Sequence, residues 1–197
     1  VDRKSKGADH EDGSLNSLAT GLCFDFSPFD KFLFLVGTEE GAVHLCSSAY
    51  SGEYQSTFDG HQLAVYKVRF SPFNSDIFLS ASADWSVKVW RMNSKAAVMT
   101  FDLGQAIVDI GWSPFNSAVF ICLSLEKLHV FDLGTNRYEP VTEIHPVDRK
   151  CTNLALNWKD PIILVGDSHG GVSSFKICKS LANPSVDLAS QEFKQKQ

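Results

Sequence analysis

Apolar and polar residues alternate in short runs along most of the chain, and these runs return four times in the same order. The clearest copy spans residues 66–92, YKVRFSPFNSDIFLSASADWSVKVWRM, where two turns rich in Ser, Pro, Asn and Asp separate three apolar runs. A period of two in β-branched and aromatic residues, bounded by such turns, predicts three short antiparallel strands. The other copies span residues 22–48, 108–133 and 152–177.

The copies are nearly evenly spaced. Taken on Phe26, Phe70, Trp112 and Trp158, the intervals are 44, 42 and 46 residues, and Ser-Pro-Phe recurs in register in the first three copies. The fourth copy is interpreted as having a first turn shortened by three residues. Further strands are expected between the copies, at residues 54–58, 97–101 and 138–144. Four strands in a repeat of this length predict an all-β fold of propeller blades, each packed on a neighbour.

The pattern divides the chain into a polar start, four repeats and a polar end. Residues 1–17 contain little to bury and are expected to form a disordered tail or loop. Residues 179–197 are expected to be a polar tail that supplies no fourth strand to the last blade. The four repeats are expected at about residues 18–60, 61–104, 105–147 and 148–178. Within the first, Gly41 is expected to supply the positive φ of the turn between the second and third strands.

Composition narrows the class of protein. The 197 residues are 44% apolar, which is enough for a sizeable core. The net charge is −5 and the 18 Lys and Arg are scattered, so we expect no nucleic-acid partner. No apolar stretch approaches the roughly 20 residues that cross a bilayer, and no signal peptide is visible, so no membrane partner is expected either. Five cysteines, an odd number, predict reduced and buried thiols: Cys23, Cys46, Cys122, Cys151 and Cys178.

The residue patterns predict no catalytic site, no metal site and no cofactor. Asp167, Ser168 and His169 are adjacent, but a hydrolytic triad needs these groups brought together in fixed roles, and adjacency in a turn does not do this. The glycine-rich stretch 166–171 is followed by a strand rather than a helix, so the phosphate-cradling geometry is missing. Cys and His residues show no metal-binding spacing. Exposed turn carboxylates are expected at Glu39, Glu40 and Glu126.

The second copy carries a recognisable set of polar residues. His61 follows Gly60 ahead of the blade, and Ser80, Asp84 and Trp90 follow in an order and spacing that resemble the signature of WD40 repeats. The usual terminal Trp-Asp reads Trp-Arg here. The resemblance implies a buried network in which His61 bonds Asp84, and Ser80 and the Trp90 indole complete it. The other copies carry Glu40, Glu126 or His169 in the turn and Cys46, Phe131 or Phe175 at the Trp90 position, so they are expected to rely on apolar packing.

Longer stretches narrow the resemblance. The segments LATGLCFDFSPFDKFLFLVGTEEGAVHLC, SASADW and AVMTFDLGQAIVDIGWSPFNSAVF are similar to the carboxy-terminal WD40 region of dynein intermediate chains, particularly those of the axonemal outer arm. The similarity covers roughly residues 18–178. That family closes a ring of about seven blades, whereas this sequence supplies four. We therefore interpret the chain as the end of a longer one, whose missing upstream part would donate the last outer strand.

The resemblance also implies a function. The expected role is a non-catalytic scaffold subunit of an axonemal dynein motor complex, located in the cytoplasm and cytoskeleton at the axoneme of cilia and flagella. Its expected partners are a dynein heavy chain, a second intermediate chain and, through regions outside this chain, dynein light chains. The alternatives are a cytoplasmic dynein intermediate chain or a WD40 peptide-binding adaptor, for instance in ubiquitin transfer. An enzymatic propeller would need convergent polar residues on the inner strands, which here read Val, Ile, Phe and Ala.

Trp85 is the candidate partner-binding residue. It follows Asp84 in the turn where WD40 repeats usually carry Gly, so its side chain should emerge on the rim of the blade. An exposed Trp is a typical interface anchor. The alternative is that Trp85 folds down over its own blade or a neighbour. Phe29, Phe73 and Phe115 each follow Pro in the first turn of a blade and are expected to plug the gaps between blades.

Overall fold

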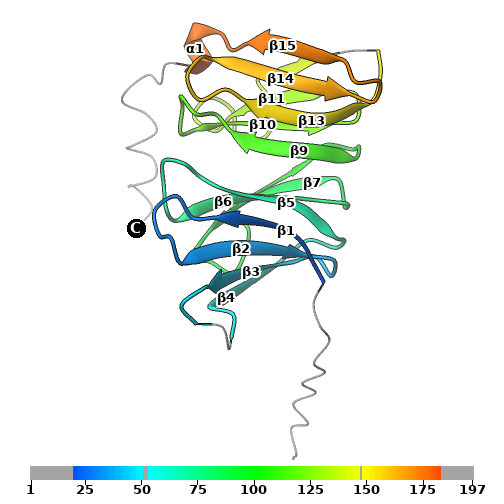
Figure 1. The fold of residues 1–197 in the computed structure, drawn as a ribbon. Coiled ribbons are helices and arrows are strands. Elements are labelled where there is room, and N and C mark those ends of the chain that lie inside the picture. Colours follow the sequence, from blue (N-terminus) through cyan, green and yellow to red (C-terminus); the bar gives the residue numbers. More distant parts are fainter. Residues whose placement is uncertain (1–19, 51–52, 147, 183–197) are drawn as a thin grey trace, which may run out of the picture.

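The structure, a computed structural model, describes residues 20–50, 53–146 and 148–182. In this part of the chain it consists of four small antiparallel sheets and one short helix (Figure 1). Each sheet pairs strands that are consecutive in the sequence, so each is one propeller blade. The prediction of an all-β fold built from four repeated blades is confirmed.

The strands are short, as the alternation of apolar and polar residues predicted. The first blade contains β1 (Gly21–Phe26), β2 (Leu33–Thr38), β3 (Ala42–Ser47) and β4 (Ser56–Asp59). The second contains β5 (Val65–Phe70), β6 (Ile77–Ser82), β7 (Ser86–Arg91) and β8 (Met99–Asp102). The third contains β9 (Ile107–Trp112), β10 (Val119–Ser124), β11 (Leu128–Asp132) and β12 (Thr142–Ile144). The fourth contains β13 (Cys151–Leu156), β14 (Ile162–Asp167) and β15 (Val172–Lys176), and α1 (Lys179–Ala182) follows it.

The predicted outer strands and tails agree with this arrangement only in part. β4, β8 and β12 lie at the expected places, but each begins two to four residues later than the sequence pattern indicated. No outer strand follows β15 within the described residues. The expected polar tail instead begins with α1, whose Leu181 packs against the core between the third and fourth blades. The expected tail at residues 1–17 lies outside the described residues, as does most of residues 179–197.

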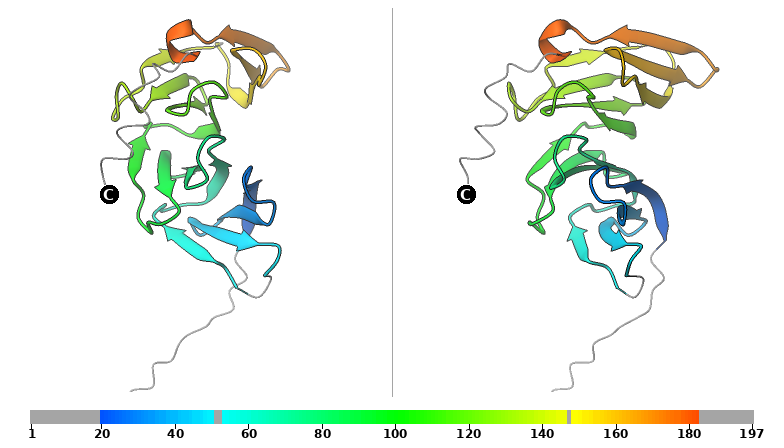
Figure 2. Two further views of the ribbon diagram at one scale, coloured as in Figure 1. Left: turned by 90° about the vertical axis from the view of Figure 1, so that its left-hand side faces the viewer. Right: turned by 60° about the vertical axis from the view of Figure 1, so that its left-hand side comes forward.

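The blades succeed one another in a curved row, from the blue first blade to the orange fourth (Figures 1 and 2). The first strand of each blade contacts the first strand of the next, so β1, β5, β9 and β13 line one side of the row. Three apolar clusters fill the spaces between successive blades. Their central side chains, among them Leu35, Phe78, Phe120 and Val165, are almost completely buried. The blades are therefore held together mainly by burial of apolar side chains between sheets.

Strand register corrects the alignment of the fourth repeat. Phe26, Phe70 and Trp112 each pair with the aromatic residue eight positions later, at Phe34, Phe78 and Phe120. The residue in the same place on β13 is Leu156, which pairs with Ile163. The prediction that Trp158 marks this position was wrong, because the first turn of the fourth blade is one residue shorter rather than three. An aromatic residue close to the expected spacing misled the alignment, since the true position is held by an aliphatic one.

Each blade also has a β-bulge near the start of its first strand, which the sequence did not indicate. Register shifts leave one residue of each first strand without a direct partner: Leu22, Tyr66, Val108 and Thr152. A bulge re-aims side chains and increases the local twist. Leu22 and Tyr66 are exposed at these bulges, at the end of the blades that also carries Gly41, whereas Val108 packs against the core between the third and fourth blades. The φ of Gly41 is +93°, and an added Cβ would lie 2.6 Å from the His61 carbonyl oxygen, which confirms that this turn requires glycine.

Two expectations about side-chain burial were wrong. Phe29 and Phe73 are 54% and 46% exposed, so they do not plug the gaps between blades. The Ser-Pro turns that carry them are closed by hydrogen bonds from their own backbone N–H groups to Ser27 and Ser71 Oγ. The cysteines are all free, but only Cys122 and Cys151 are buried; Cys23 and Cys46 are half-buried and Cys178 is exposed.

One face of the first blade carries apolar side chains that nothing in the described chain covers. Phe24 and Phe26 are 65% and 56% exposed on β1, and Phe26 lies against Phe34 of β2 with ring centroids 5.6 Å apart. The corresponding side chains of the second blade, including Val68 and Phe70, are buried against the first blade. This face therefore has the composition of a core surface without a neighbour.

We expect the isolated 197-residue chain to self-associate through this face. The double variant Phe24→Ser/Phe26→Ser removes the two exposed rings of β1 from this face and should shift the chain toward monomer, which light scattering after size-exclusion chromatography would measure. Phe73→Ser, which removes an exposed Phe from a turn, is the matched control and should change the distribution little. A monodisperse monomer for the unmodified chain would contradict the prediction and favour a closed ring of four blades.

Candidate protein-interaction site

The four polar residues singled out in the second blade lie together. Trp90 Nε1 donates to Ser80 Oγ at 2.7 Å, Ser80 Oγ lies 2.6 Å from His61 Nε2, and His61 Nδ1 lies 3.0 Å from Asp84 Oδ2. Since an indole N–H can only donate, the Ser80 hydroxyl accepts a hydrogen bond from Trp90 and donates one to His61 Nε2. His61 is then neutral with its proton on Nδ1, which donates to the Asp84 carboxylate. The chain of bonds has one direction and links β7, β6, the loop before β5 and the β6–β7 turn.

Two further serines complete the network, and the sequence reasoning missed both. Ser86 Oγ donates to Asp84 Oδ1 at 2.6 Å, and the Ser86 and Gln62 N–H groups donate to the same carboxylate at 3.0 Å each. Ser82 Oγ donates to the Leu63 carbonyl oxygen at 2.8 Å. The spacing of Asp84 and Ser86 is that of a side-chain turn, in which an Asp accepts from the residue two positions later. That spacing could have identified Ser86.

Both titratable members of the network are held in the states that the geometry requires. Burial lowers the pKa of His61 and outweighs the opposing effect of Asp84, so the imidazole stays neutral. Burial by itself would raise the pKa of Asp84, but the hydrogen bonds from Ser86 and Gln62 outweigh it and lower the pKa to about 2. Asp84 is therefore a carboxylate in the folded protein.

Packing around the Trp90 indole explains the glycine before His61. A Cβ added to Gly60 would lie 2.9 Å from Trp90 Cη2, so only glycine fits without movement of the ring. Trp90 itself is fully buried and stacks on Phe78 with centroids 5.9 Å apart. The Gly-His pair thus places the loop directly on the indole, and the network makes the β6–β7 turn a well-anchored element.

Trp85 stands at the tip of this anchored turn. Its φ is +66°, a left-handed conformation that costs a residue other than glycine of order 1–3 kcal/mol. Backbone bonds hold it there, since its N–H donates to the Ser82 carbonyl and its own carbonyl accepts from Leu103 N–H. The side chain is 50% exposed. Trp85 therefore emerges on the rim, at the end of the blade where Leu63 and Tyr66 are also exposed.

The third blade holds a second polar cluster, with Ser124 and His129 buried and Glu143 at the surface, that the sequence did not suggest. His129 Nε2 lies 3.2 Å from Ser124 Oγ, and His129 Nδ1 lies 3.0 Å from Glu143 Oε1. The other carboxylate oxygen, Glu143 Oε2, pairs with Lys127 Nζ. The order of atoms is that of a serine–histidine–carboxylate triad. Ser124 is completely buried, however, and its Oγ is also bonded to the backbone of Lys127. The cluster therefore ties β10, β11 and β12 together in place of the network of the second blade.

The other sequence candidates lie in exposed turns. Glu39, Glu40 and Glu126 are exposed. In the fourth blade, Asp167 accepts hydrogen bonds from the backbone N–H groups of His169 and Gly171 rather than from the imidazole. Ser168 Oγ lies 3.2 Å from His169 Nδ1 on the surface. The three adjacent residues thus form a turn and not a triad.

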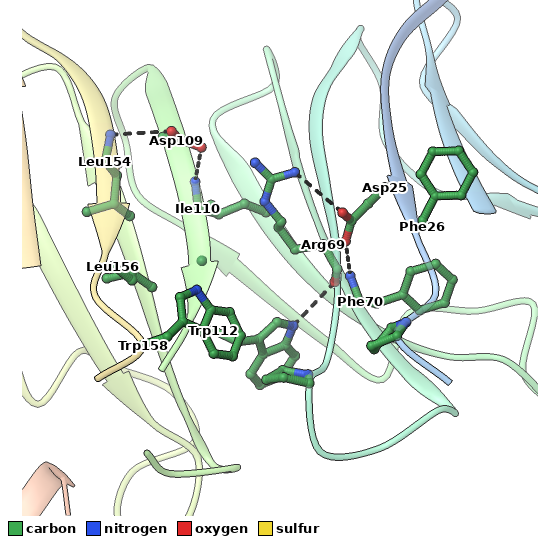
Figure 3. Close-up of a pocket in the computed structure, with 13 residues that line it drawn as sticks. Asp25, Phe26, Arg69, Phe70, Asp109, Ile110, Trp112, Leu154, Leu156 and Trp158 are labelled. Carbon is green, nitrogen blue, oxygen red and sulfur yellow. Dashed lines mark hydrogen bonds and ion pairs between the residues drawn. The ribbon is translucent and has the colours of Figure 1, made fainter. Parts of the chain in front are cut away.

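A concave cavity of about 360 Å³ lies among the first strands of the four blades (Figure 3). The expectation that these strands carry only apolar side chains was wrong, because Asp25, Arg69 and Asp109 line the cavity. Asp25 accepts the Phe70 N–H at 2.8 Å and Asp109 accepts the Leu154 N–H at 3.3 Å, so each carboxylate ties its blade to the next. The sequence does contain a signal for these cavity residues, because they are charged residues at alternate positions of an otherwise apolar pattern. The sequence reasoning did not use it.

Among residues 20–50, 53–146 and 148–182, no three His, Cys, Asp or Glu side chains are grouped so that they could hold a metal ion. No helix in the described ranges is long and apolar enough to span a membrane.

One known protein family matches the second blade. The family described as "WD domain, G-beta repeat" matches residues 52–91, which include His61, Ser80, Asp84 and Trp90. Together with the four repeated blades, this match makes the chain a WD40-repeat protein of the β-propeller class.

Comparison with curated proteins identifies the branch of this class. The chain is 47% identical to "Dynein intermediate chain 2, ciliary" of Heliocidaris crassispina over 87% of its own length and 25% of that protein. It is 39% identical to "Dynein, 78 kDa intermediate chain, flagellar outer arm" of Chlamydomonas reinhardtii over 98% of its own length and 29% of that protein. It is 36% identical to "Dynein axonemal intermediate chain 1" of Bos taurus over 90% of its own length and 26% of that protein. The chain therefore belongs to the dynein intermediate chain family and spans about a quarter of the length of the curated relatives it matches.

Proposed function

We propose that this chain is the WD40 part of a non-catalytic scaffold subunit of an axonemal dynein motor complex. The observation that carries the proposal is the similarity over almost the whole chain to intermediate chains described as ciliary, flagellar and axonemal. Those descriptions favour the axoneme of cilia and flagella over the cytoplasmic alternative. In this proposal the protein binds a dynein heavy chain and a second intermediate chain, and light chains bind through regions outside this chain.

The geometry supports a binding role for the rim of the second blade. The network around His61 and Asp84 fixes the turn, and Trp85 occupies a conformation that glycine would adopt without strain. A large aromatic side chain placed at a strained and exposed position adds little to the packing of its own blade. It does supply a rigid surface of the kind that anchors protein interfaces. We therefore propose Trp85 as an anchor for a partner subunit.

The variant Trp85→Gly is expected to weaken partner binding and leave the fold intact. Loss of an interface anchor costs roughly 2–4 kcal/mol of binding, whereas glycine relieves the positive φ and should keep or slightly raise the melting temperature. The measurement is co-purification of heavy chain and second intermediate chain with the tagged full-length protein from cilia, alongside thermal melting of the purified variant.

Tyr138→Ala is the matched control, because Tyr138 is also exposed but lies in the β11–β12 loop. It should retain all partners. A large fall in melting temperature for Trp85→Gly would show that Trp85 belongs to the core. Unchanged co-purification with unchanged melting would show that Trp85 is not an anchor. Absence of dynein subunits from the unmodified protein's partners would contradict the scaffold proposal itself.

A further inference from the structure

The concave cavity lies at the opposite end of the blades from Trp85. Trp85 follows the end of β6, whereas Pro72, which lines the cavity, precedes the start of β6. The cavity is bounded by residues of β1, β5, β9 and β13 and by the turns that follow β1, β5 and β13 (Figure 3). It is therefore a second site, independent of the rim that the proposed function uses.

The carboxylates of the cavity have little capacity left for a ligand. Asp109 Oδ1 accepts the Ile110 N–H at 3.0 Å and lies 3.5 Å from Lys67 Nζ, while its Oδ2 accepts the Leu154 N–H. Asp25 Oδ2 accepts the Phe70 N–H. Three of the four oxygens are thus bonded to backbone N–H groups of the chain itself. A cationic ligand would have to compete with these bonds and with Lys67 and Arg69.

Arg69 has the opposite character. Its Nη1 donates to the Val68 carbonyl oxygen at 3.2 Å and lies 3.9 Å from Asp25 Oδ1, a separation too long for a hydrogen bond. A guanidinium has five N–H donors, and the contacts that the structure gives Arg69 use only Nη1. The side chain is about one-third exposed and reaches into the cavity (Figure 3). The unsatisfied hydrogen-bonding capacity of the site therefore belongs to donors, and it calls for an acceptor with negative charge.

The walls of the cavity are apolar and continue onto the surface. Phe26, Trp112 and Trp158 line it together with Pro28 and Pro72. The residue after each of these prolines is an exposed phenylalanine, at 54% and 46% exposure. A small free anion would leave this aromatic surface uncovered, whereas a polypeptide with apolar residues beside an acidic one would cover it.

We propose that this cavity binds an acidic side chain flanked by apolar residues on a partner polypeptide, with Arg69 pairing with the carboxylate. The apolar neighbours of that side chain pack on Trp158 and on the Ser-Pro-Phe turns. This assigns a role to the exposed Phe29 and Phe73, which the turns themselves do not need. It goes beyond the scaffold proposal, because it concerns a separate face and specifies the chemistry of the segment bound.

Selection from a random peptide library displayed on phage tests the proposal with the full-length protein. Peptides that bind are expected to be enriched in Asp or Glu next to Leu, Phe or Trp. A selected peptide should bind Arg69→Gln about tenfold or more weakly, because a charge-assisted bond is lost. Arg149→Gln, which alters an exposed Arg outside the cavity, is the matched control and should bind as the unmodified protein does.

Charge reversal and competition sharpen the test. Selection of peptides that bind the Arg69→Glu variant should enrich Lys or Arg in place of the acidic residue. Free glutamate should not displace the peptide, and Trp85→Gly should leave binding unchanged, which separates this site from the one in the proposed function. Equal peptide binding to Arg69→Gln, enrichment of basic residues by the unmodified protein, displacement by free glutamate, or the absence of any selected peptide would each overturn the proposal.

Discussion

Replacing Trp90 by alanine is expected to lower the free energy of unfolding by about 3–5 kcal/mol. Trp90 is fully buried and contacts the rings of Phe58 and Phe78, so it belongs to the cluster that joins the first blade to the second. Its removal leaves a cavity between two blades and also deprives Ser80 Oγ of a donor. Chemical denaturation monitored by far-ultraviolet circular dichroism would measure the loss.

A second variant separates packing from hydrogen bonding. Trp90→Phe keeps an aromatic ring in the cluster, as Phe131 does in the third blade, but removes the indole N–H. We expect it to recover most of the stability that Trp90→Ala loses. If both variants lost the same amount, the hydrogen bond to Ser80 rather than the ring would be the main contribution of Trp90.

The second large effect is expected for Asp84→Ala. Removal of the carboxylate leaves His61 Nδ1, Ser86 Oγ and the Gln62 N–H without this acceptor, and His61 and Ser86 are buried. Loss of such a partner costs on the order of 1–3 kcal/mol. Glu40→Ala and Glu126→Ala are controls, because both side chains lie in the corresponding turns and are exposed. Equal shifts in melting temperature for all three would show that the network contributes nothing.

The pH dependence provides an independent check on Asp84. Its pKa is lowered to about 2 in the folded protein, from about 3.9 in an unfolded chain. The unfolded state therefore takes up this proton first as the pH falls, so the stabilisation is complete above about pH 4 and declines toward about pH 2. The difference in unfolding free energy between the unmodified protein and Asp84→Ala should shrink over this range. A difference independent of pH between 4 and 2 would contradict the assigned ionisation.

The candidate site shows where sequence reasoning succeeds. His61, Ser80, Asp84 and Trp90 could be grouped from the sequence because their spacing matches a repeat whose geometry is recurrent. Ser86 was missed although it donates to the same carboxylate, because its spacing from Asp84, which is that of a side-chain turn, was not used. The cluster of Ser124, His129 and Glu143 was also missed, because its members lie on three strands that only the register brings together.

Arg69 and Asp25 illustrate the same limit at the concave cavity. They are 44 residues apart, on the first strands of successive blades, and each alone is a charged residue in an alternating run. Their side chains meet only because adjacent blades place these strands side by side. Phe29 and Phe73 show the converse error. A repeated aromatic residue next to a proline suggested packing, yet the turn is closed by serine hydroxyls and leaves the rings outside.

The sequence by itself determined the all-β class, the number of repeats and four residues of the second-blade network, His61, Ser80, Asp84 and Trp90. These properties depend on local alternation, turn residues and spacing, which are written along the chain. The tertiary structure alone decided that Leu156 rather than Trp158 is the residue of the fourth blade equivalent to Phe26 in the first. It also decided that Phe24 and Phe26 form an uncovered face and that Arg69 lies beside Asp25. The reason is physical. Strand register is set by the pairing of whole strands rather than by one aromatic residue at an expected spacing. The packing of one blade on the next arises from contacts between residues more than 40 positions apart, and no local pattern encodes which side chains will remain without a neighbour.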